Sequence, residues 1–255
     1  DVVVSNVAGG GGTVGAADCL KYDADGSYML ALNPSPTYVS TKDKPLTFDI
    51  LKDYEFAAIM VQDQRLFVTS AKNTNFQTVE EAIEYGKANP GKFNIGCSGT
   101  GNSAYATAEE FLEKTGIEGN VVPFDGSSEA KSAVLGGHID VAVQSLSDVS
   151  SSMNEVTILA TGGEERFSKT PDVPCMTELG FPMAQYVTRG YAFKAGTDSA
   201  IINYWSDKIG EVCENEAFLK EADSLGLPIV YMNHEEAQED AKTEMATYQE
   251  KFGDK

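Results

Sequence analysis

Two glycine-rich segments have the composition and spacing to bind an anion. The first, residues 9–15 (GGGGTVG), lies between a β-branched run and an expected helix. The second, residues 96–103 (GCSGTGNS), lies between an expected strand and another helix. Glycine lets a ligand approach the backbone closely, and the first N–H groups of a helix have no acceptor within the helix. Each segment therefore predicts a loop that donates hydrogen bonds to an anion.

The first segment also contains the spacing of the G-x-G-x-x-G dinucleotide-binding fingerprint, at Gly10, Gly12 and Gly15. That fingerprint needs an acidic residue about 20 positions further on, at the end of the next strand, to bind the ribose hydroxyls. Here Asp23 and Asp25 come before the next expected strand and not at its end. The incomplete motif leaves three interpretations open: an anion-binding loop, a tight strand-to-helix turn, and a less favoured NAD site.

The second segment superficially resembles the G-x-S-x-G nucleophile elbow, but Thr100 occupies the position of the last glycine. An activated serine also needs a base, and neither His138 nor His234 lies in a supporting motif. We therefore expect binding and no catalysis. The predicted ligand-binding residues of this segment are Ser98, Gly99, Thr100, Asn102 and Ser103.

Two further segments follow expected strands. Asp125, within residues 122–129 (VPFDGSSE), is a candidate ligand contact, but it or Ser127 is more simply interpreted as the cap of the next helix. Gln144 and Ser145 come directly after another expected strand. Ligands usually bind beyond the carboxyl ends of strands in open α/β sheets, so both are candidate contacts.

The four cysteines are dispersed and form no C-x-x-C pair. Zinc sites and thioredoxin-type motifs use closely spaced cysteines, so we expect no metal and no redox motif. The simplest interpretation is four small buried apolar residues, whose redox state the sequence leaves open. No cofactor is expected either. The cysteines are Cys19, Cys97, Cys175 and Cys213.

The charge balance disfavours some classes of partner. The 255 residues include 19 Lys and Arg against 39 Asp and Glu, a formal net charge of −20. Nucleic-acid-binding domains usually carry a basic surface and anionic membranes attract basic segments, so we expect neither as a partner. No apolar run approaches the ~18 residues of a membrane span. The 42% of hydrophobic residues is enough for a sizeable core.

Strands alternate with helices along most of the chain, a pattern typical of βαβ units and of a mostly parallel sheet. Thr78 and Glu81 form an expected capping box at the start of one helix. The expected strands are 2–4, 27–32, 55–61, 65–69, 93–95, 121–123, 139–143, 156–160 and 229–231. The expected helices are 14–20, 78–88, 102–115, 127–135, 199–215 and 235–252.

Several motifs occur in an order that is typical of one family. The chain contains FNIGCSGTG at 93–101, VPFDG at 122–126 and LGGHID at 135–140. It also contains NVAGGGGTVG at 6–15 and PDVPCMTELGF at 171–181. Together they resemble the motifs of the substrate-binding receptors of tripartite tricarboxylate transporters, also called Bug-family or TctC-like receptors.

The resemblance covers nearly the whole chain but has departures. Ala8 stands where the family has proline, Cys175 stands where it has threonine, and residues 189–197 lack two family prolines. Family members begin with an additional strand and a P-x-G-G-x-x-D-type loop. We therefore expect that an N-terminal βα unit is missing from this chain and that this weakens ligand binding.

The resemblance implies an α/β, type II periplasmic-binding-protein fold with two lobes joined by crossing strands. We expect lobe 1 at 1–68 with 190–255, and lobe 2 at 69–189. The resemblance also implies a receptor that captures a di- or tricarboxylate, or a related organic acid, between its lobes and delivers it to the permease subunits of a membrane transporter. It implies a periplasmic or extracytoplasmic monomer, lipid-anchored in its precursor, that is not an enzyme.

On this interpretation, Gly11, Gly12 and Thr13 of lobe 1 bind ligand carboxylates together with the donors of the second segment. No basic side chain lies in either segment. Neutral donors are sufficient to bind a carboxylate, because each hydrogen bond to a charged group contributes about 1.5–3 kcal/mol. The repulsion between the ligand and the net negative charge of the protein is screened beyond about 8 Å. Two alternatives remain open: an NAD-binding oxidoreductase, and a sensor-type binding protein without a transport role.

Overall fold

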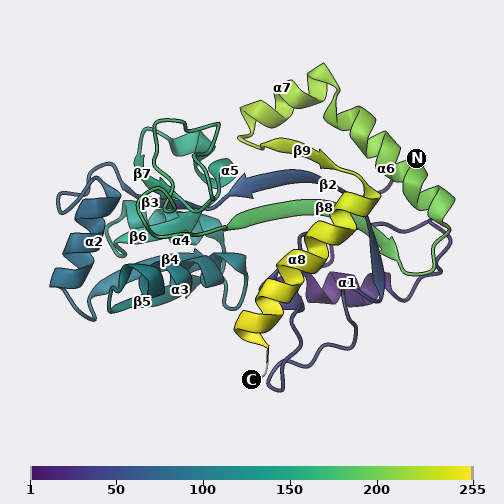
Figure 1. The fold of residues 1–255 in the computed structure, drawn as a ribbon, viewed down its shortest axis with the longest axis horizontal. Helices are drawn as coiled ribbons and strands as arrows, with labels where there is room; N and C mark the ends of the chain where they lie inside the picture. The colour runs from purple at the N-terminus through teal and green to yellow at the C-terminus, as the bar shows by residue number, and fades with distance from the viewer. Residues whose placement is uncertain (1, 254–255) are drawn as a thin grey trace. The chain divides into compact units, whose positions relative to one another are not determined.

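The computed structural model describes residues 2–253, which form two compact units. Within this range, unit 1 contains residues 2–62, 188–223 and 229–253, and unit 2 contains residues 63–187 and 224–228. The chain passes between the units inside β2 (Tyr54–Gln64) and β8 (Tyr186–Lys194), and again on either side of 224–228 (Figure 1). The domain boundaries expected after residues 68 and 189 stay a prediction.

Unit 2 is built on a five-stranded sheet with the strand order β5-β4-β6-β3-β7. Its strands are β3 (Leu66–Ser70), β4 (Phe93–Ser98), β5 (Gly119–Phe124), β6 (Val141–Gln144) and β7 (Val156–Thr161). Its helices are α2 (Val79–Ala88), α3 (Ser103–Thr115), α4 (Ser127–Leu135), α5 (Leu146–Val149) and the 3₁₀ turn η3 (Ser150–Ser152). The expected capping box of Thr78 and Glu81 is confirmed at the start of α2.

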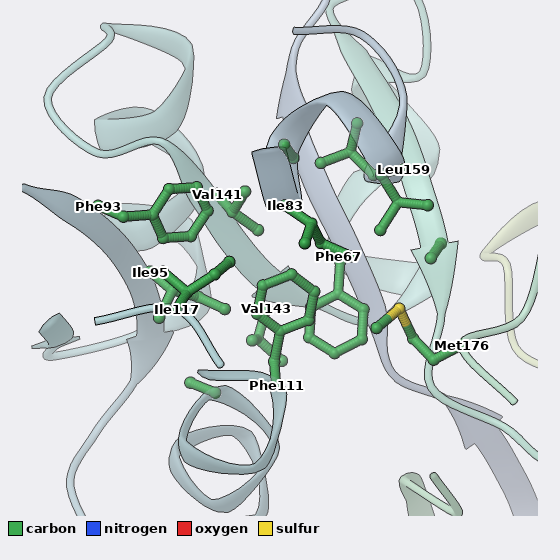
Figure 2. Close-up of a cluster of buried hydrophobic side chains, with 14 of the residues drawn as sticks. Phe67, Ile83, Phe93, Ile95, Phe111, Ile117, Val141, Val143, Leu159 and Met176 are labelled. Carbon is green, nitrogen blue, oxygen red and sulfur yellow. The ribbon is translucent and has the colours of Figure 1, made fainter. Parts of the chain in front are cut away.

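Helices cover both faces of this sheet. On one face, the rings of Phe67, Phe93 and Phe111 come from β3, β4 and α3, and the Phe111 centroid lies 4.6 Å from Phe67 and 6.4 Å from Phe93 (Figure 2). On the other face, Leu66 and Ala142 belong to a second buried cluster, to which α4 contributes. The two cores fix the strands, so the loops at the strand ends start from rigid positions.

Unit 1 contains a four-stranded sheet with the order β1-β8-β2-β9. Its remaining strands are β1 (Leu30–Leu32) and β9 (Ile229–Met232). Its helices are η1 (Gly10–Gly12), α1 (Thr13–Cys19), η2 (Pro36–Tyr38), α6 (Ser199–Cys213), α7 (Glu216–Ser224, whose last residue falls in unit 2) and α8 (His234–Phe252). Tyr54 anchors α1 to this sheet, because its hydroxyl donates to the Ala16 carbonyl at 2.5 Å.

The prediction of mostly parallel sheets is wrong. β4 is parallel to β5 and β6, but β3 is antiparallel to both β6 and β7. In unit 1, β1 is antiparallel to β8 and β2 is antiparallel to β9. In unit 2 the antiparallel pairs come from β3, which enters its sheet directly from β2 of the other sheet and is joined to neither β6 nor β7 by a βαβ crossover.

Two strand predictions also need correction. Val2, Val3 and Val4 form no strand and are 77%, 87% and 82% exposed, because no described strand pairs with them and a strand needs a partner for its N–H and C=O groups. Conversely, β8 was not predicted, since polar Thr188 and Arg189 and then Gly190 interrupt its apolar pattern. Gly190 is required there, because a Cβ would lie 2.3 Å from the Ala58 carbonyl oxygen of β2.

Candidate functional site

The carboxyl ends of three strands form one edge of the unit 2 sheet. β5, β4 and β6 run in the same direction and end at Phe124, Ser98 and Gln144. β3 begins at the same edge, because its first residue, Leu66, pairs with Gln144. Helices α3, α4 and α5 start just beyond this edge, where ligands bind in open α/β sheets. We call residues 98–104, 124–128 and 144–148 the strand-end region.

The loop from Ser98 to Asn102 is closed by its own hydrogen bonds. Gly99 and Gly101 have φ values of 72° and 67°, which glycine adopts without strain. The Gly99 N–H donates to the Phe124 carbonyl at 2.7 Å and ties the loop to β5. Asn102 caps α3, since its Oδ1 accepts from the Tyr105 N–H at 3.0 Å, and its Nδ2 donates to the Ser98 carbonyl. Both ends of the Asn102 amide therefore hold the loop in shape.

Backbone donors remain available in this loop. Among residues 2–253, no acceptor is found for the successive N–H groups of residues 100–104, which include exposed Thr100. They lead into α3, a helix of 13 residues, whose N-terminus carries the positive end of the helix dipole. A short row of N–H groups at a helix start is the arrangement that binds carboxylate or phosphate oxygens.

A buried arginine lies against the same helix start. Arg65 Nη2 donates to Ser103 Oγ at 2.5 Å, and the two residues are 8% and 2% exposed. Arg65 is the one lysine or arginine classed as buried in the described part of the chain. Because Ser103 Oγ accepts this bond, its own hydroxyl proton points elsewhere. Arg65 was not among the residues predicted from the sequence, where its position between two apolar strands was the available signal.

Burial dominates the electrostatics of the neighbouring thiol. The pKa of Cys97 is raised to about 12, chiefly because the thiol is buried, although the Arg65 charge acts in the opposite direction. Cys97 is therefore a neutral thiol at physiological pH. This agrees with the interpretation of Cys97 as a small buried apolar residue and gives it no role as a nucleophile.

Gln144 and Ser145 have different surroundings although they are adjacent. Gln144 is fully buried, and its Nε2 donates to the Ser127 carbonyl at 3.3 Å while its Oε1 has no partner among the described residues. Ser145 is the N-cap residue of α5, and Asp148 Oδ2 accepts from both its N–H at 2.9 Å and its hydroxyl at 2.6 Å. Ser145 and Asp148 thus hold the start of α5 in place. The Oε1 atom of Gln144 remains an acceptor without a partner among the described residues.

Asp125 is exposed at the start of α4. The interpretation of Asp125 or Ser127 as the helix cap is wrong, since Gly126 is the N-cap residue and no side chain accepts a capping bond there. The Ser127 hydroxyl instead donates to Asp148 Oδ1 at 2.8 Å. A ligand contact at Asp125 stays a prediction.

The glycine segment of unit 1 adopts a backbone that only glycine takes readily. Gly11 and Gly12 have φ values of 65° and 101°, and a Cβ on Gly11 would lie 2.8 Å from Thr37 Cγ2. Thr13 is buried, and its hydroxyl donates to the Gly10 carbonyl at 2.9 Å. The segment leads into α1, but no described strand precedes it, so the strand–loop–helix context of a dinucleotide fingerprint is absent from residues 2–253.

Tyr38 adds a donor beside this segment that was not predicted from the sequence. A Cβ on Gly12 would lie 3.0 Å from the Tyr38 hydroxyl, so the hydroxyl lies directly against the glycine backbone. Burial raises the pKa of Tyr38 to about 12, which keeps the hydroxyl protonated at neutral pH. No hydrogen bond of this hydroxyl is found within the described range. The signal available in the sequence was only the turn Ser35-Pro36 that begins η2.

The two histidines have different surroundings. The His234 ring Nδ1 lies 2.7 Å from the Phe56 carbonyl, a pure acceptor, so this nitrogen is a donor that fixes the ring. His138 is exposed beyond the end of α4. In residues 2–253, no three His, Cys, Asp or Glu side chains are grouped to hold a metal, and no helix is long and apolar enough to cross a bilayer.

A family model described as "Tripartite tricarboxylate transporter family receptor" matches residues 1–250. The chain belongs to this family. A curated relative in Cupriavidus necator, the UPF0065 protein in the gbd 5' region, is 29% identical over 261 residues, covering 99% of this chain and 78% of that protein. Protein BugT of Bordetella pertussis is 29% identical over 229 residues, with 86% and 68% covered.

Solved structures show that this family member has the two-lobe periplasmic-binding fold expected from its sequence. Rpa4515 of R. palustris, solved with adipate, matches with a TM-score of 0.86 at 18% identity and covers 97% of this chain and 84% of that one. MatC (Rpa3494) from Rhodopseudomonas palustris, solved with bound malate, matches with a TM-score of 0.79 at 18% identity, with 95% and 84% covered. Identities this low show the fold alone.

Proposed function

We propose that the chain is an extracytoplasmic receptor that binds a small organic carboxylate and delivers it to the membrane subunits of a tripartite tricarboxylate transporter. The observation that carries the proposal is the row of N–H groups at residues 100–104, which meets the start of α3 beside Arg65. Family membership supports it. So do the adipate and malate named for two structural relatives, since both are dicarboxylates.

The free energies of the proposed hydrogen bonds are consistent with micromolar binding of a carboxylate, although the protein has a net charge of −20. Each hydrogen bond to a carboxylate contributes about 1.5–3 kcal/mol, and a helix N-terminus adds about 0.3–1 kcal/mol. Three or four such donors give a gross attraction comparable to the roughly 8 kcal/mol of micromolar binding, from which ordering and desolvation subtract. The surface charges act at long range and are screened beyond about 8 Å.

The proposed contacts come from both units. In unit 2 they are the backbone at Gly99 and residues 100–104, with Ser98, Thr100, Asn102, Ser103, Asp125, Gln144 and Ser145 around it. In unit 1 they are Gly11, Gly12 and Thr13, to which we add the Tyr38 hydroxyl because it lies against Gly12. Within residues 2–253, the Gly12 and Gly99 N–H groups and the Thr13 hydroxyl already donate to the carbonyls of Gly9, Phe124 and Gly10, so the donors proposed to reach a ligand directly are the N–H groups of residues 100–104 and the Tyr38 hydroxyl.

Isothermal titration calorimetry with a panel of di- and tricarboxylates tests the binding proposal. We expect at least one acid to bind with a dissociation constant of about 1–100 μM and to raise the melting temperature. Amide and alcohol analogues of that acid, which carry no negative charge, are the matched controls and should not bind. If no carboxylate binds or shifts the melting temperature, the proposal is wrong.

Transport and sensing are separated in cells. Deleting the gene should abolish uptake of the radiolabelled carboxylate if the protein feeds a permease, and restoring the gene should recover uptake. Unchanged uptake, combined with a lost transcriptional response to the same acid, would instead indicate a sensor.

A further inference from the structure

Gln185 joins Arg65, the residue before β3, to helix α3 through both its backbone and its side chain. Its carbonyl accepts from the Arg65 N–H at 3.0 Å, and its N–H donates to the Gly162 carbonyl at 2.8 Å. The Gly162 N–H in turn donates to the Arg65 carbonyl at 2.7 Å. A Cβ on Gly162 would lie 3.1 Å from Gln185 Cβ and 3.5 Å from Arg65 Cβ, so the three residues pack closely. The Gln185 backbone is therefore fixed against that of Arg65.

The Gln185 side chain contacts α3 at two positions. Its Nε2 donates to Glu110 Oε2 at 2.6 Å, and its Oε1 lies 2.9 Å from Thr107 Oγ1. A carboxylate oxygen can only accept, so the amide nitrogen faces Glu110 and the amide oxygen faces Thr107. Thr107 and Glu110 are three residues apart and lie on the same face of the helix. Gln185 therefore holds this face of α3 through both ends of its amide.

These contacts close a ring of hydrogen bonds that includes the guanidinium of Arg65. Arg65 Nη2 donates to Ser103 Oγ, and the Ser103 carbonyl accepts from the Thr107 hydroxyl at 2.8 Å. The Thr107 hydroxyl shares its proton with Gln185 Oε1, and the Gln185 carbonyl accepts the Arg65 N–H. Arg65, Ser103 and Thr107 are 8%, 2% and 0% exposed. Because a buried polar group that loses its partner is costly, the ring holds the guanidinium in one position against the start of α3.

We propose that Gln185 is a positioning residue of the carboxylate site: without touching the ligand, it holds the Arg65 guanidinium and the first turn of α3 in the geometry that binds a carboxylate. This inference rests on the proposed function. A binding group must be held within about 0.5 Å of its productive position, which a long arginine side chain does not achieve alone. Gln185 is followed directly by β8, in which Val187 is the last residue of unit 2. The ring therefore ties the proposed site to a segment by which the chain leaves unit 2.

Two threonines of α3 offer a matched pair of variants. Thr107 and Thr115 are both buried, and their hydroxyls donate to the carbonyls four residues earlier, Ser103 at 2.8 Å and Phe111 at 2.6 Å. Thr107 also bonds to Gln185, and Thr115 lies at the far end of the helix. In calorimetry with succinate, malate, adipate and citrate, we expect Thr107→Val to lower the affinity for each acid that binds by about tenfold. Thr115→Val should leave the affinity unchanged, although urea denaturation should show similar losses of stability in both variants.

Substitutions of Gln185 add a pH profile, which a merely structural role would not change. In Gln185→Glu at low pH, the new carboxyl O–H can donate to Glu110 and its carbonyl can accept from Thr107, as the amide does. As the pH rises, the new group ionises, loses its donor and repels Glu110. Its affinity should be within about threefold of the parent at pH 5 and at least about tenfold weaker at pH 8, whereas Gln185→Met should be weaker at both. Lys114, 3.7 Å from Glu110 Oε1, is common to all three proteins, and comparing them at each pH cancels the ionisation of the acid.

The outcomes separate the two proposals. If the parent binds no acid, the proposed function itself fails. If the parent binds an acid and folded Gln185→Met and Thr107→Val bind it equally tightly, the positioning role is wrong and the receptor function stands. Equal losses of affinity in Thr107→Val and Thr115→Val would also overturn that role, because helix stability alone would explain them. If Thr107→Val or Gln185→Met does not fold, as judged by circular dichroism, Gln185→Glu decides: an affinity relative to the parent that stays constant from pH 5 to pH 8 overturns the inference.

Discussion

Arg65 and Ser103 are 38 residues apart in the sequence, yet Arg65 Nη2 donates to Ser103 Oγ at 2.5 Å. The bond joins the start of β3 to the first residue of α3, and both residues are buried. It places a guanidinium beside the helix N-terminus and the available N–H groups of residues 100–104. The positive potential of the proposed site therefore has two sources, the helix dipole and a side chain.

Replacing this guanidinium should weaken carboxylate binding. For Arg65→Met we expect about a tenfold or larger loss of affinity, because a charged partner of the helix start is removed. Arg65→Lys should recover only part of it, since an ammonium lacks the planar fork of donors. Calorimetry measures both. Arg166→Met, which removes an exposed arginine paired with Glu178, is the control and should bind normally. Unchanged affinity in folded Arg65→Met would contradict the role of Arg65.

Asn102 offers a pair of variants that separate folding from binding. Asn102→Ala removes the cap of α3 and should lower the free energy of unfolding by about 0.5–2 kcal/mol. Asn102→Asp keeps an acceptor for the Tyr105 N–H, so it should retain more stability, but its negative charge beside residues 100–104 should reduce carboxylate affinity more than tenfold. Urea denaturation and calorimetry give the two readouts. Equal affinity in Asn102→Asp and the parent would argue against an anion at this loop.

Tyr38→Phe tests whether unit 1 takes part in binding. The change removes only the hydroxyl that lies against Gly12, so the fold should be retained. We expect carboxylate affinity to fall about three- to tenfold, the value of one hydrogen bond. The matched control is Tyr204→Phe, because Tyr204 is 57% exposed on α6. If both variants bind like the parent, the proposed contact at Tyr38 is wrong.

The stability of unit 1 should depend on pH through Glu244. Burial and then the charge of Asp240 raise the pKa of Glu244 to about 8, while the 2.9 Å hydrogen bond from Thr188 acts in the opposite direction. The folded state therefore binds more protons than the unfolded state between the ordinary glutamate pKa, about 4.3, and about 8. Stability must fall as pH rises through that window.

Urea denaturation at pH 5 to 9 measures this decline, which we expect to exceed about 1 kcal/mol. Glu244→Gln should remove most of it and should make the protein more stable than its parent at pH 8. Glu239→Gln changes an exposed carboxylate of the same helix that pairs with Lys242, and it should leave the slope unchanged. A slope that persists in Glu244→Gln would place the titrating group elsewhere.

Local signals in the sequence predicted α1, α2, α3, α4, α6 and α8, but not α5 or α7. Thr78 and Glu81 fix the start of α2, and the bounds expected for α4, residues 127–135, are those observed. These features depend on hydrogen bonds and φ angles within a few residues, which the local sequence determines. The family was also predicted correctly, because its motifs occur in the same order along most of the chain.

Only the tertiary structure decided which residues surround the strand-end region. The direction of β3, the burial of Arg65 against Ser103 and the unpaired Oε1 of Gln144 all depend on partners that are distant in the sequence. The same is true of Tyr38 at Gly12. The sequence determined the two glycine loops by itself, since their conformations are local. Burial and strand pairing are collective properties of the packed chain, so the charged and amide groups around those loops became visible only in the fold.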